Sequence, residues 1–289
     1  MRPAGWQIVV VVLVVAFPAY PQSHVSILCN FIRSSSMSTT APLEPNLQIQ
    51  IAGHKVSGVS SASSPGARRI MLLQDTSGSM RGNLKDVAWT AVEDFARNVD
   101  LGDRLALVDF NDHAYIDVDF RDPQSFSQDL ADRGLKKKLL PKGPTAVFDA
   151  VWASETHLAK DPHPGDSIVI ISDSSDNASH YGESAVEDKM TSSPVRVYLL
   201  WLGNASAHNQ QSLKFVNAVI ETGGAVFETD KNKIGEEVQT LRTLIEKPNL
   251  VQFDVDPPIA KREEVTTSLD SQSSMAGLRA ICPHYLNPQ

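Results

Sequence analysis

The 289-residue chain has few cysteines, no excess of basic charge and no apolar run long enough to span a bilayer. Lys and Arg number 26 against 34 Asp and Glu, which gives a formal net charge of −8. This balance argues against a nucleic acid as the partner. The histidines do not pair at a spacing typical of zinc ligands. Cys29 and Cys282 are the only cysteines, and the sequence leaves open whether they pair or remain free thiols.

Residues 1–22 have the pattern of a secretory signal peptide. One Arg precedes an apolar run over residues 8–17, and small residues and Pro follow it. We therefore expect an exported protein that is periplasmic, secreted or membrane-anchored. The alternative is that residues 1–22 stay in place as a membrane anchor, which would be the chain's only contact with a membrane.

Three regions follow this N-terminal segment. Residues 23–68 are rich in Ser and Pro, which predicts a linker with one possible strand at 47–52. Residues 69–247 alternate between β-rich and helical patterns and are expected to form one domain. Residues 248–289 begin with an alternating strand pattern at 249–256 and continue as a flexible tail.

The central region predicts a doubly wound α/β fold. Three of its strand candidates are apolar on both faces, which is typical of buried parallel strands. A short turn at 111–114 joins two candidates as a hairpin, so one edge strand should be antiparallel. The predicted strands are 70–74, 104–110, 115–120, 167–172, 195–202 and 225–228. The predicted helices are 84–99 with Asn83 as its cap, 146–159, 184–191, 210–221 and 234–246.

Polar side chains follow the first of these strands, where ligands bind in such sheets. The loop QDTSGSM carries Asp75, Ser77 and Ser79 at alternate positions, so an extended chain would point them the same way. Thr145 follows a Gly-Pro turn at the start of a helix, and Asp173 ends another buried strand. Carboxylate and hydroxyl oxygens are the ligands that hard divalent cations prefer.

These residues together resemble the metal-ion-dependent adhesion site, or MIDAS, of von Willebrand factor type A domains. The resemblance covers about residues 69–247 and includes RRIMLLQDTSGSM, GDRLALVDFND, GPTAVFDAVW, VRVYLLWLG and ETGGAVFET, which look like the exported bacterial subgroup. It implies a Rossmann-like fold with a mostly parallel sheet and one antiparallel edge strand. It also implies an adhesion or interaction module rather than an enzyme.

The resemblance implies a role for each candidate residue. Ser77 and Ser79 would bind Mg²⁺, or Mn²⁺ or Ca²⁺, directly. Thr145 would bind it directly or through water, and Asp75 and Asp173 would act mostly through water. A partner protein would supply an Asp or Glu carboxylate. The sequence departs from the family at Ser174, where the family usually has Gly, and Ser adopts a positive φ less readily than Gly.

Each candidate also has a structural interpretation. Asp75 and Asp173 could cap a turn or helix, Ser77 and Ser79 could bond nearby backbone, and Thr145 could be a helix N-cap. Asp176 could be a further ligand or a solvated loop residue.

Two other functions remain open. A hydrolase or phosphatase could use Asp75, although the loop lacks the Gly-x-Ser-x-Gly pattern of serine hydrolases. A scaffold domain without metal is the third possibility.

Overall fold

The structure is a computed structural model of the chain. It describes residues 23–33, 36–39, 47–63, 66–173, 176–203, 210–269 and 278–288. The predicted signal segment 1–22 lies outside these residues, as does Ser174. Within the described residues no helix is both long and apolar enough to cross a membrane.

A six-stranded sheet forms the centre of the α/β unit, in the order β10-β9-β8-β5-β6-β7. All neighbouring strands are parallel except β6 and β7, which pair antiparallel at the edge. This arrangement confirms the predicted doubly wound fold with one antiparallel edge strand. The strands are β5 (Arg69–Asp75), β6 (Arg104–Phe110), β7 (Ala114–Arg121), β8 (Ser167–Ser172), β9 (Arg196–Leu202) and β10 (Val226–Thr229).

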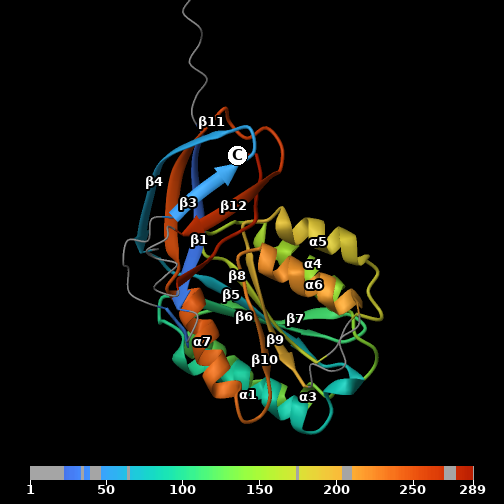
Figure 1. Cartoon of the computed structure of the whole chain (residues 1–289). Helices are drawn as coiled ribbons and strands as arrows, with labels where there is room; N and C mark the ends of the chain where they lie inside the picture. Colours follow the sequence, from blue (N-terminus) through green and yellow to red (C-terminus); the bar gives the residue numbers. More distant parts are fainter. Residues whose placement is uncertain are drawn as a thin grey trace, which may run out of the picture.

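Helices cover both faces of this sheet, which explains why its inner strands are apolar on both sides (Figure 1). Ile70 and Leu72 of β5 belong to the core beneath α1 and α7, whereas Met71 and Leu73 belong to the core beneath α4 and α6. The helices are α1 (Asn83–Asn98), α2 (Pro123–Asp132), α3 (Leu135–Lys138), α4 (Val147–Leu158), α5 (Glu183–Thr191), α6 (Gln210–Glu221) and α7 (Ile234–Glu246).

Two details of the helices differ from the sequence prediction. The N-cap of α1 is Gly82 rather than Asn83, because the chain enters the helix with a positive φ of 67° that favours glycine. Helices α2 and α3 were not predicted. The first begins with Asp122 as its cap, since the Asp122 side chain accepts a hydrogen bond from the Ser125 amide, and Pro123 follows it.

Strands from both ends of the chain form a second unit, above the α/β unit in Figure 1. One sheet has the order β13-β1-β11-β4 with β2 paired to β1, and a smaller sheet has the order β14-β12-β3. The buried residues between them include Phe31, Ile49, Phe253 and Val265. The strands are β1 (Ser23–Arg33), β2 (Ser36–Thr39), β3 (Leu47–Ile51), β4 (Lys55–Ser63), β11 (Asn249–Asp256), β12 (Glu263–Leu269), β13 (Leu278–Ile281) and β14 (Tyr285–Leu286).

This β-sandwich corrects the expectation of a linker over 23–68 and of a flexible tail after residue 256. The strands expected at 47–52 and 249–256 are present as β3 and β11. The Ser-rich segment forms β4, an edge strand whose side chains are mostly exposed, so its polar composition is compatible with a sheet. The apolar residues Val25, Ile27, Cys29 and Phe31 alternate along β1 and point into the core. Each end alone exposes an apolar face, and the two ends bury these faces together.

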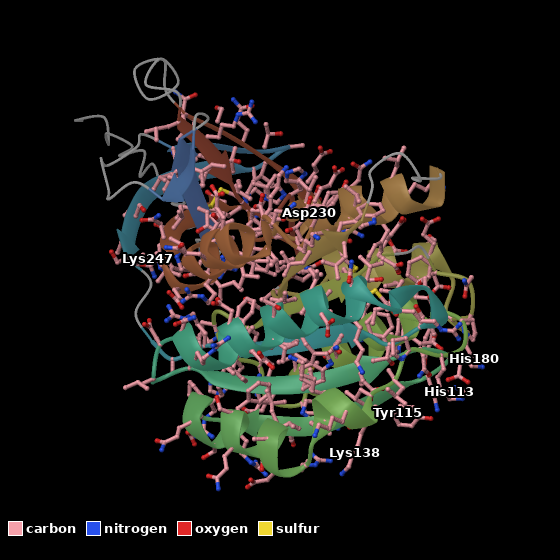
Figure 2. All side chains as sticks on the ribbon, turned by 90° about the horizontal axis from the view of Figure 1, so that it is seen from below. His113, Tyr115, Lys138, His180, Asp230 and Lys247 are labelled. Atoms are coloured by element: carbon pink, nitrogen blue, oxygen red, sulfur yellow. A yellow bond between two sulfur atoms is a disulfide. The ribbon has the colours of Figure 1, made fainter. Side chains whose placement is uncertain are left out.

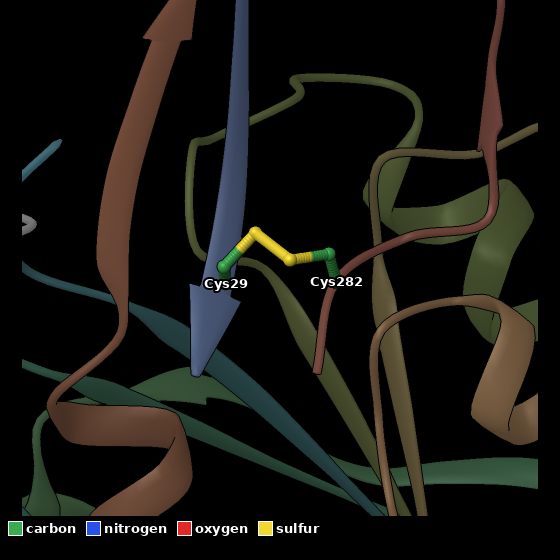
Figure 3. The surroundings of a disulfide bond; sticks show 2 residues. All are labelled: Cys29 and Cys282. Carbon is green, nitrogen blue, oxygen red and sulfur yellow. A yellow bond between two sulfur atoms is a disulfide. The ribbon is translucent and has the colours of Figure 1, made fainter. Parts of the chain in front are cut away.

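A disulfide joins Cys29 and Cys282, which are 253 residues apart in sequence (Figure 3). Cys29 lies in β1, and Cys282 directly follows β13, which pairs with β1. Both cysteines belong to the core of the β-sandwich. The bond therefore ties the two ends of the chain to each other within the sandwich.

Candidate metal centre

The loop after β5 is held against the neighbouring strand. The Thr76 amide donates to the carbonyl of Phe110 at 2.7 Å, so the chain follows β6 for one residue beyond β5. A short 3₁₀ turn, Gly78–Met80, then reverses it, and the buried Met80 side chain anchors the turn in the core. Asp75, Ser77 and Ser79 therefore lie at the carboxyl end of the sheet, as the fold class predicts.

Asp75 is a buried carboxylate with a partner on each oxygen. The Ser77 amide donates to Oδ1 at 2.7 Å, and the Ser172 hydroxyl donates to Oδ2 at 2.5 Å. Burial raises the pKa of Asp75 to about 6, against the lowering effect of the hydrogen bonds from Ser172 and Ser77. The charge of Asp173 raises this pKa further. Among the described residues, no positive charge acts on this pKa to compensate the ionised form of Asp75.

Two serine hydroxyls connect this loop to the end of β8. Ser77 Oγ lies 3.0 Å from Ser79 Oγ, and the Ser79 hydroxyl donates to Oδ1 of Asp173 at 2.8 Å. Adjacent oxygens around an octahedral Mg²⁺ are about 2.9 Å apart, because each lies about 2.1 Å from the ion. The three oxygens have the chemistry of ligands to such an ion, and the Ser77–Ser79 and Ser79–Asp173 distances match the spacing of adjacent ligands, so these residues fit a divalent cation.

The Thr145 loop is bonded to the Asp75 loop through the backbone. The Gly78 amide donates to the carbonyl of Gly143 at 2.8 Å, and the Lys142 amide donates to the carbonyl of Thr76 at 2.8 Å. A Cβ on Gly78 would lie 3.1 Å from the Gly143 oxygen, which is a tight contact. The small residue at position 78 thus permits the two loops to approach each other.

Thr145 is also held by residues that follow β8 in the chain. Its amide donates to the Asn177 side chain at 2.8 Å, and its carbonyl accepts from the amides of Asn177 and Ala178 at 2.9 and 3.0 Å. Thr145 is buried, and the N-cap of α4 is Ala146, with no side-chain cap. The interpretation of Thr145 as the N-cap is therefore wrong. The three predicted loops meet at one edge of the sheet.

Sequence reasoning missed two supporting residues, Ser172 and Asn177. Ser172 is the last residue of β8 and holds Asp75, while Asn177 holds Thr145. The position of Ser172 at the end of a buried strand, directly before Asp173, was the sequence feature that could have indicated its role. No feature of the sequence indicated the role of Asn177. Asp176, considered as a further ligand, instead accepts hydrogen bonds from the Phe148 amide at 3.1 Å and from Ser179.

A second buried carboxylate lies beneath the loop. Asp109 of β6 accepts a hydrogen bond from the Thr76 hydroxyl at 3.3 Å. Burial raises the pKa of Asp109 to about 7, and the neighbouring Asp117 carboxyl of β7 raises it as well. Asp109 therefore supports the loop as a buried carboxyl that binds its proton more tightly than usual, rather than as an exposed charge.

The donor set depends on hydroxyl oxygens. Within the described ranges, no three or more His, Cys, Asp and Glu side chains are grouped so that they could hold a metal ion. Ser77 is buried, Ser79 is exposed and Asp173 is partly exposed, so the centre opens to solvent at its Ser79 side. A cation bound here would have protein oxygens on one side and an open side for further ligands.

Comparison with known proteins supports the fold. Residues 70–175 match the von Willebrand factor type A domain family. A structure of von Willebrand factor type A from Catenulispora acidiphila has a TM-score of 0.55 at 12% identity, over 83% of this chain and 74% of that chain. No curated protein sequence matches the chain significantly.

A second solved structure carries a metal. Proximal thread matrix protein 1 from the mussel byssus, with a zinc-occupied MIDAS motif, has a TM-score of 0.51 at 15% identity, over 66% of this chain and 49% of that chain. Identities this low establish a common fold and nothing finer. The family match over residues 70–175, the strand order and the position of the Asp75 loop agree, and the α/β unit of this chain has the fold of von Willebrand factor type A domains.

Proposed function

We propose that this chain is an exported interaction module that binds a protein partner through a divalent cation. Asp75, Ser77, Ser79, Thr145 and Asp173 would hold the cation. The observation that carries the proposal is the continuous series of contacts from Asp75 through Ser77 and Ser79 to Asp173. A partner would approach from the solvent side of Ser79.

When bound, the cation supplies an electrophilic centre that attracts a carboxylate of the partner. The residues of this chain would have different roles at the site. Ser77 and Ser79 contribute neutral oxygens, which leave the positive charge of the cation available to the partner. Asp75 and Asp173 contribute negative charge that retains the cation. Ser172 and Asn177 orient Asp75 and Thr145 by hydrogen bonds.

The ligand chemistry favours Mg²⁺, with Mn²⁺ or Ca²⁺ as alternatives. All candidate ligands are hydroxyl or carboxylate oxygens, which suit hard cations. The mussel protein is described with zinc in its MIDAS motif, so this type of site also accepts a softer ion. A comparison of metals is therefore part of any test.

Exposed rings beside the centre support a protein as the partner. Tyr115 is 56% exposed and Tyr181 is 42% exposed. The His113 ring stacks on Tyr115 and lies 6.4 Å from His180, and Figure 2 shows the three labelled residues His113, Tyr115 and His180 together at one corner of the domain. Tyrosine and other aromatic residues are enriched at protein interfaces.

His113 and His180 belong to loops that are tied to the candidate metal centre, and Tyr115 lies at the start of β7 next to the first of them. Asn111, two residues before His113, accepts a hydrogen bond from the Ala146 amide at 2.6 Å, and the loop of His180 is joined to Thr145 through Asn177. A partner whose carboxylate reaches the cation would therefore also contact these rings.

The burial of Asp75 argues against an enzyme that uses it as a nucleophile. Asp75 is 1% exposed, and each of its carboxylate oxygens already accepts a hydrogen bond. A nucleophilic carboxylate must reach the reacting atom of its substrate. Asp75 would have to break its bond to Ser172 or Ser77 before it could do so.

The disulfide supports export. Structural disulfides form and persist in oxidising compartments such as the periplasm and the extracellular space. The Cys29–Cys282 bond lies in the buried core of the β-sandwich, where it can contribute to stability. This agrees with a leader function for residues 1–22.

The proposed function is tested by capture of surface proteins from the source cells on immobilised chain. Capture is expected in Mg²⁺, to be lost in EDTA and to be restored by added Mg²⁺. Ser79→Ala should abolish the Mg²⁺-dependent capture, whereas Asp132→Asn, an exposed carboxylate at the end of α2, should leave it unchanged. Capture that is equal in EDTA and Mg²⁺ would favour a scaffold domain without metal.

A further inference from the structure

A buried arginine lies at the amino ends of the parallel strands, whereas the candidate metal centre lies at their carboxyl ends. Arg196 begins β9, and its residue is 1% exposed. Its terminal nitrogens donate to the carbonyls of Leu244 and Ile245 at 3.3 and 3.4 Å, in the last turn of α7. A guanidinium at this end of a helix interacts favourably with the helix dipole.

The charge of Arg196 is not paired. Within the part of the chain that the structure describes, no carboxylate forms an ion pair with it. The neighbouring Arg68 is itself positive and is bound to Asp103 and Asp100, at 3.0 and 2.8 Å. Burial lowers the pKa of Arg196, the interaction with Tyr198 raises it, and the charge of Arg68 lowers it. A buried, unpaired charge carries a large free-energy cost.

Polar groups of Arg196, Tyr198 and Asn30 lack hydrogen-bond partners among the described residues. The Arg196 Nε–H, the Tyr198 hydroxyl and both amide atoms of Asn30 are buried without a hydrogen-bond partner among the described residues. The Arg196 guanidinium carbon lies 5.6 Å from the centre of the Tyr198 ring. Burial raises the pKa of Tyr198, whereas Arg196 and the Asn30 amide lower it, so all three groups lie close together.

These groups come from three separate elements at the junction of the two units. Asn30 is in β1 of the β-sandwich, Tyr198 and Arg196 are in β9 of the central sheet, and the carbonyls are in α7. Asn30 is 1% exposed and Tyr198 is fully buried. Buried polar groups in native proteins are almost always satisfied by protein, water or ions.

We propose that Arg196, Tyr198 and Asn30 bind a small monovalent anion, chloride being the physiological example. The Nε–H, the phenol O–H and the Asn30 amide N–H are all donors, so one anion can accept from each of them. A water molecule could satisfy some of these donors but would leave the charge of Arg196 uncompensated. A bound anion would accept hydrogen bonds from these donors and would also compensate the charge of Arg196.

The anion would join the β-sandwich to the α/β unit. The anion would be bound by residues of β1 and β9, and Arg196 also contacts the end of α7. These residues can bind one anion together only when the two units are packed against each other. Anion binding should therefore stabilise the folded chain without acting at the metal centre. This inference does not depend on the proposed partner function.

The test is the thermal stability of the whole chain at constant ionic strength, with sodium chloride or sodium bromide replacing sodium gluconate. We expect Tm to rise saturably with chloride and bromide, by about 2 °C at an anion concentration about five times the dissociation constant. Tyr198→Phe should weaken the apparent affinity for chloride several-fold. Tyr115→Phe, a change at an exposed tyrosine of β7, should leave it unchanged.

A crystal grown in bromide provides a second readout that does not depend on variants that may lose stability. An anomalous bromide peak within hydrogen-bond distance of Arg196 Nε and Tyr198 Oη would support the site. Water density at that place without a bromide peak, or a Tm that does not respond to halide, would overturn the proposal.

Discussion

The Ser172 hydroxyl donates to Oδ2 of Asp75 at 2.5 Å and fixes the carboxylate at the centre of the candidate metal site. The two residues are 97 positions apart and lie at the ends of adjacent parallel strands, β8 and β5. Ser172 touches Asp75 rather than the place of the cation, so its effect on metal binding should be indirect. This relationship gives the first prediction.

Ser172→Ala should weaken Mg²⁺ binding by about 10- to 100-fold, as is typical when a residue that orients a metal ligand is lost. The substitution leaves Asp75, Ser77, Ser79 and Asp173 in place, so some binding should remain. Isothermal titration calorimetry measures the change. Ser154→Ala, at another buried serine whose hydroxyl bonds the Ala150 carbonyl within α4, provides the matched control. Equal affinities in wild type and Ser172→Ala would contradict the assigned role.

Gly78→Ala should lower the Mg²⁺ affinity several-fold while changing Tm little. The added Cβ would lie 3.1 Å from the Gly143 carbonyl and would move the Thr145 loop away from Ser77 and Ser79. Gly235→Ala is the control, since a Cβ there meets no atom within 4 Å and the residue lies in α7. That variant should bind Mg²⁺ like the wild type. A normal affinity in Gly78→Ala would show that the contact between the loops does not position the ligands.

Glu155 should make the chain less stable as pH rises from about 5 to 8. Burial raises the pKa of this α4 carboxyl to about 8, against the lowering effects of Ser193 and Lys189. Between the ordinary glutamate value of 4.5 and this raised pKa, the unfolded chain is ionised while the folded chain holds the proton. The unfolded state therefore binds fewer protons, and stability falls as pH rises through this window.

Glu155→Gln should remove this contribution and gain stability relative to wild type as the pH increases. Chemical denaturation at several pH values measures the difference. Glu264→Gln, at an exposed position of β12, should follow the wild type. The raised pKa would be contradicted if the free energies of unfolding of wild type and Glu155→Gln differed by the same amount at every pH from 5 to 8.

Removal of the disulfide should destabilise the chain by about 2–5 kcal/mol. The bond closes a segment of 253 residues and lies in the core of the β-sandwich. Cys29→Ser with Cys282→Ser tests this by denaturant unfolding under non-reducing conditions. The Mg²⁺ affinity of the folded variant should not change, because the disulfide lies in the other unit. A loss of Mg²⁺ binding in the folded variant would show that the two units are coupled.

The α/β unit could be predicted from the sequence because its signals are local. The strand at 167–172 is apolar at its inner positions 168–171 and has the same bounds in the structure, as has the strand at 104–110. Residues packed on both faces of a sheet must be apolar at every position, which leaves a continuous run. The helix at 234–246 likewise has its predicted bounds.

The β-sandwich was missed for a physical reason. Its two sheets are made from segments about 200 residues apart in sequence, such as β1 and β11, and neither segment can bury its apolar side alone. The Ser content of β4 indicated a linker, although an exposed edge strand tolerates serine. Only the register, for example Ile27 opposite Val251, shows that the segments pair.

The candidate metal centre could be predicted from the sequence where its residues follow a strand end or, as Thr145 does, precede a helix. Asp75, Ser77, Ser79 and Asp173 occupy such positions, and the structure brings them into contact. Asn177 could not be assigned because its role depends on the path of the loop after Asp173. The Arg196 cluster was equally hidden, since it requires the packing of β1 against β9.

The most direct test of the account is a titration of Mg²⁺ into the whole chain, followed by thermal stability and calorimetry. The wild type should bind one equivalent of Mg²⁺ and rise in Tm with its concentration. The double variant Asp75→Ala with Ser77→Ala should show neither effect, and Asp132→Asn should behave like the wild type. A wild type that shows neither heat of binding nor a shift in Tm with Mg²⁺, Mn²⁺ or Ca²⁺ would contradict the assignment of this loop as a metal centre.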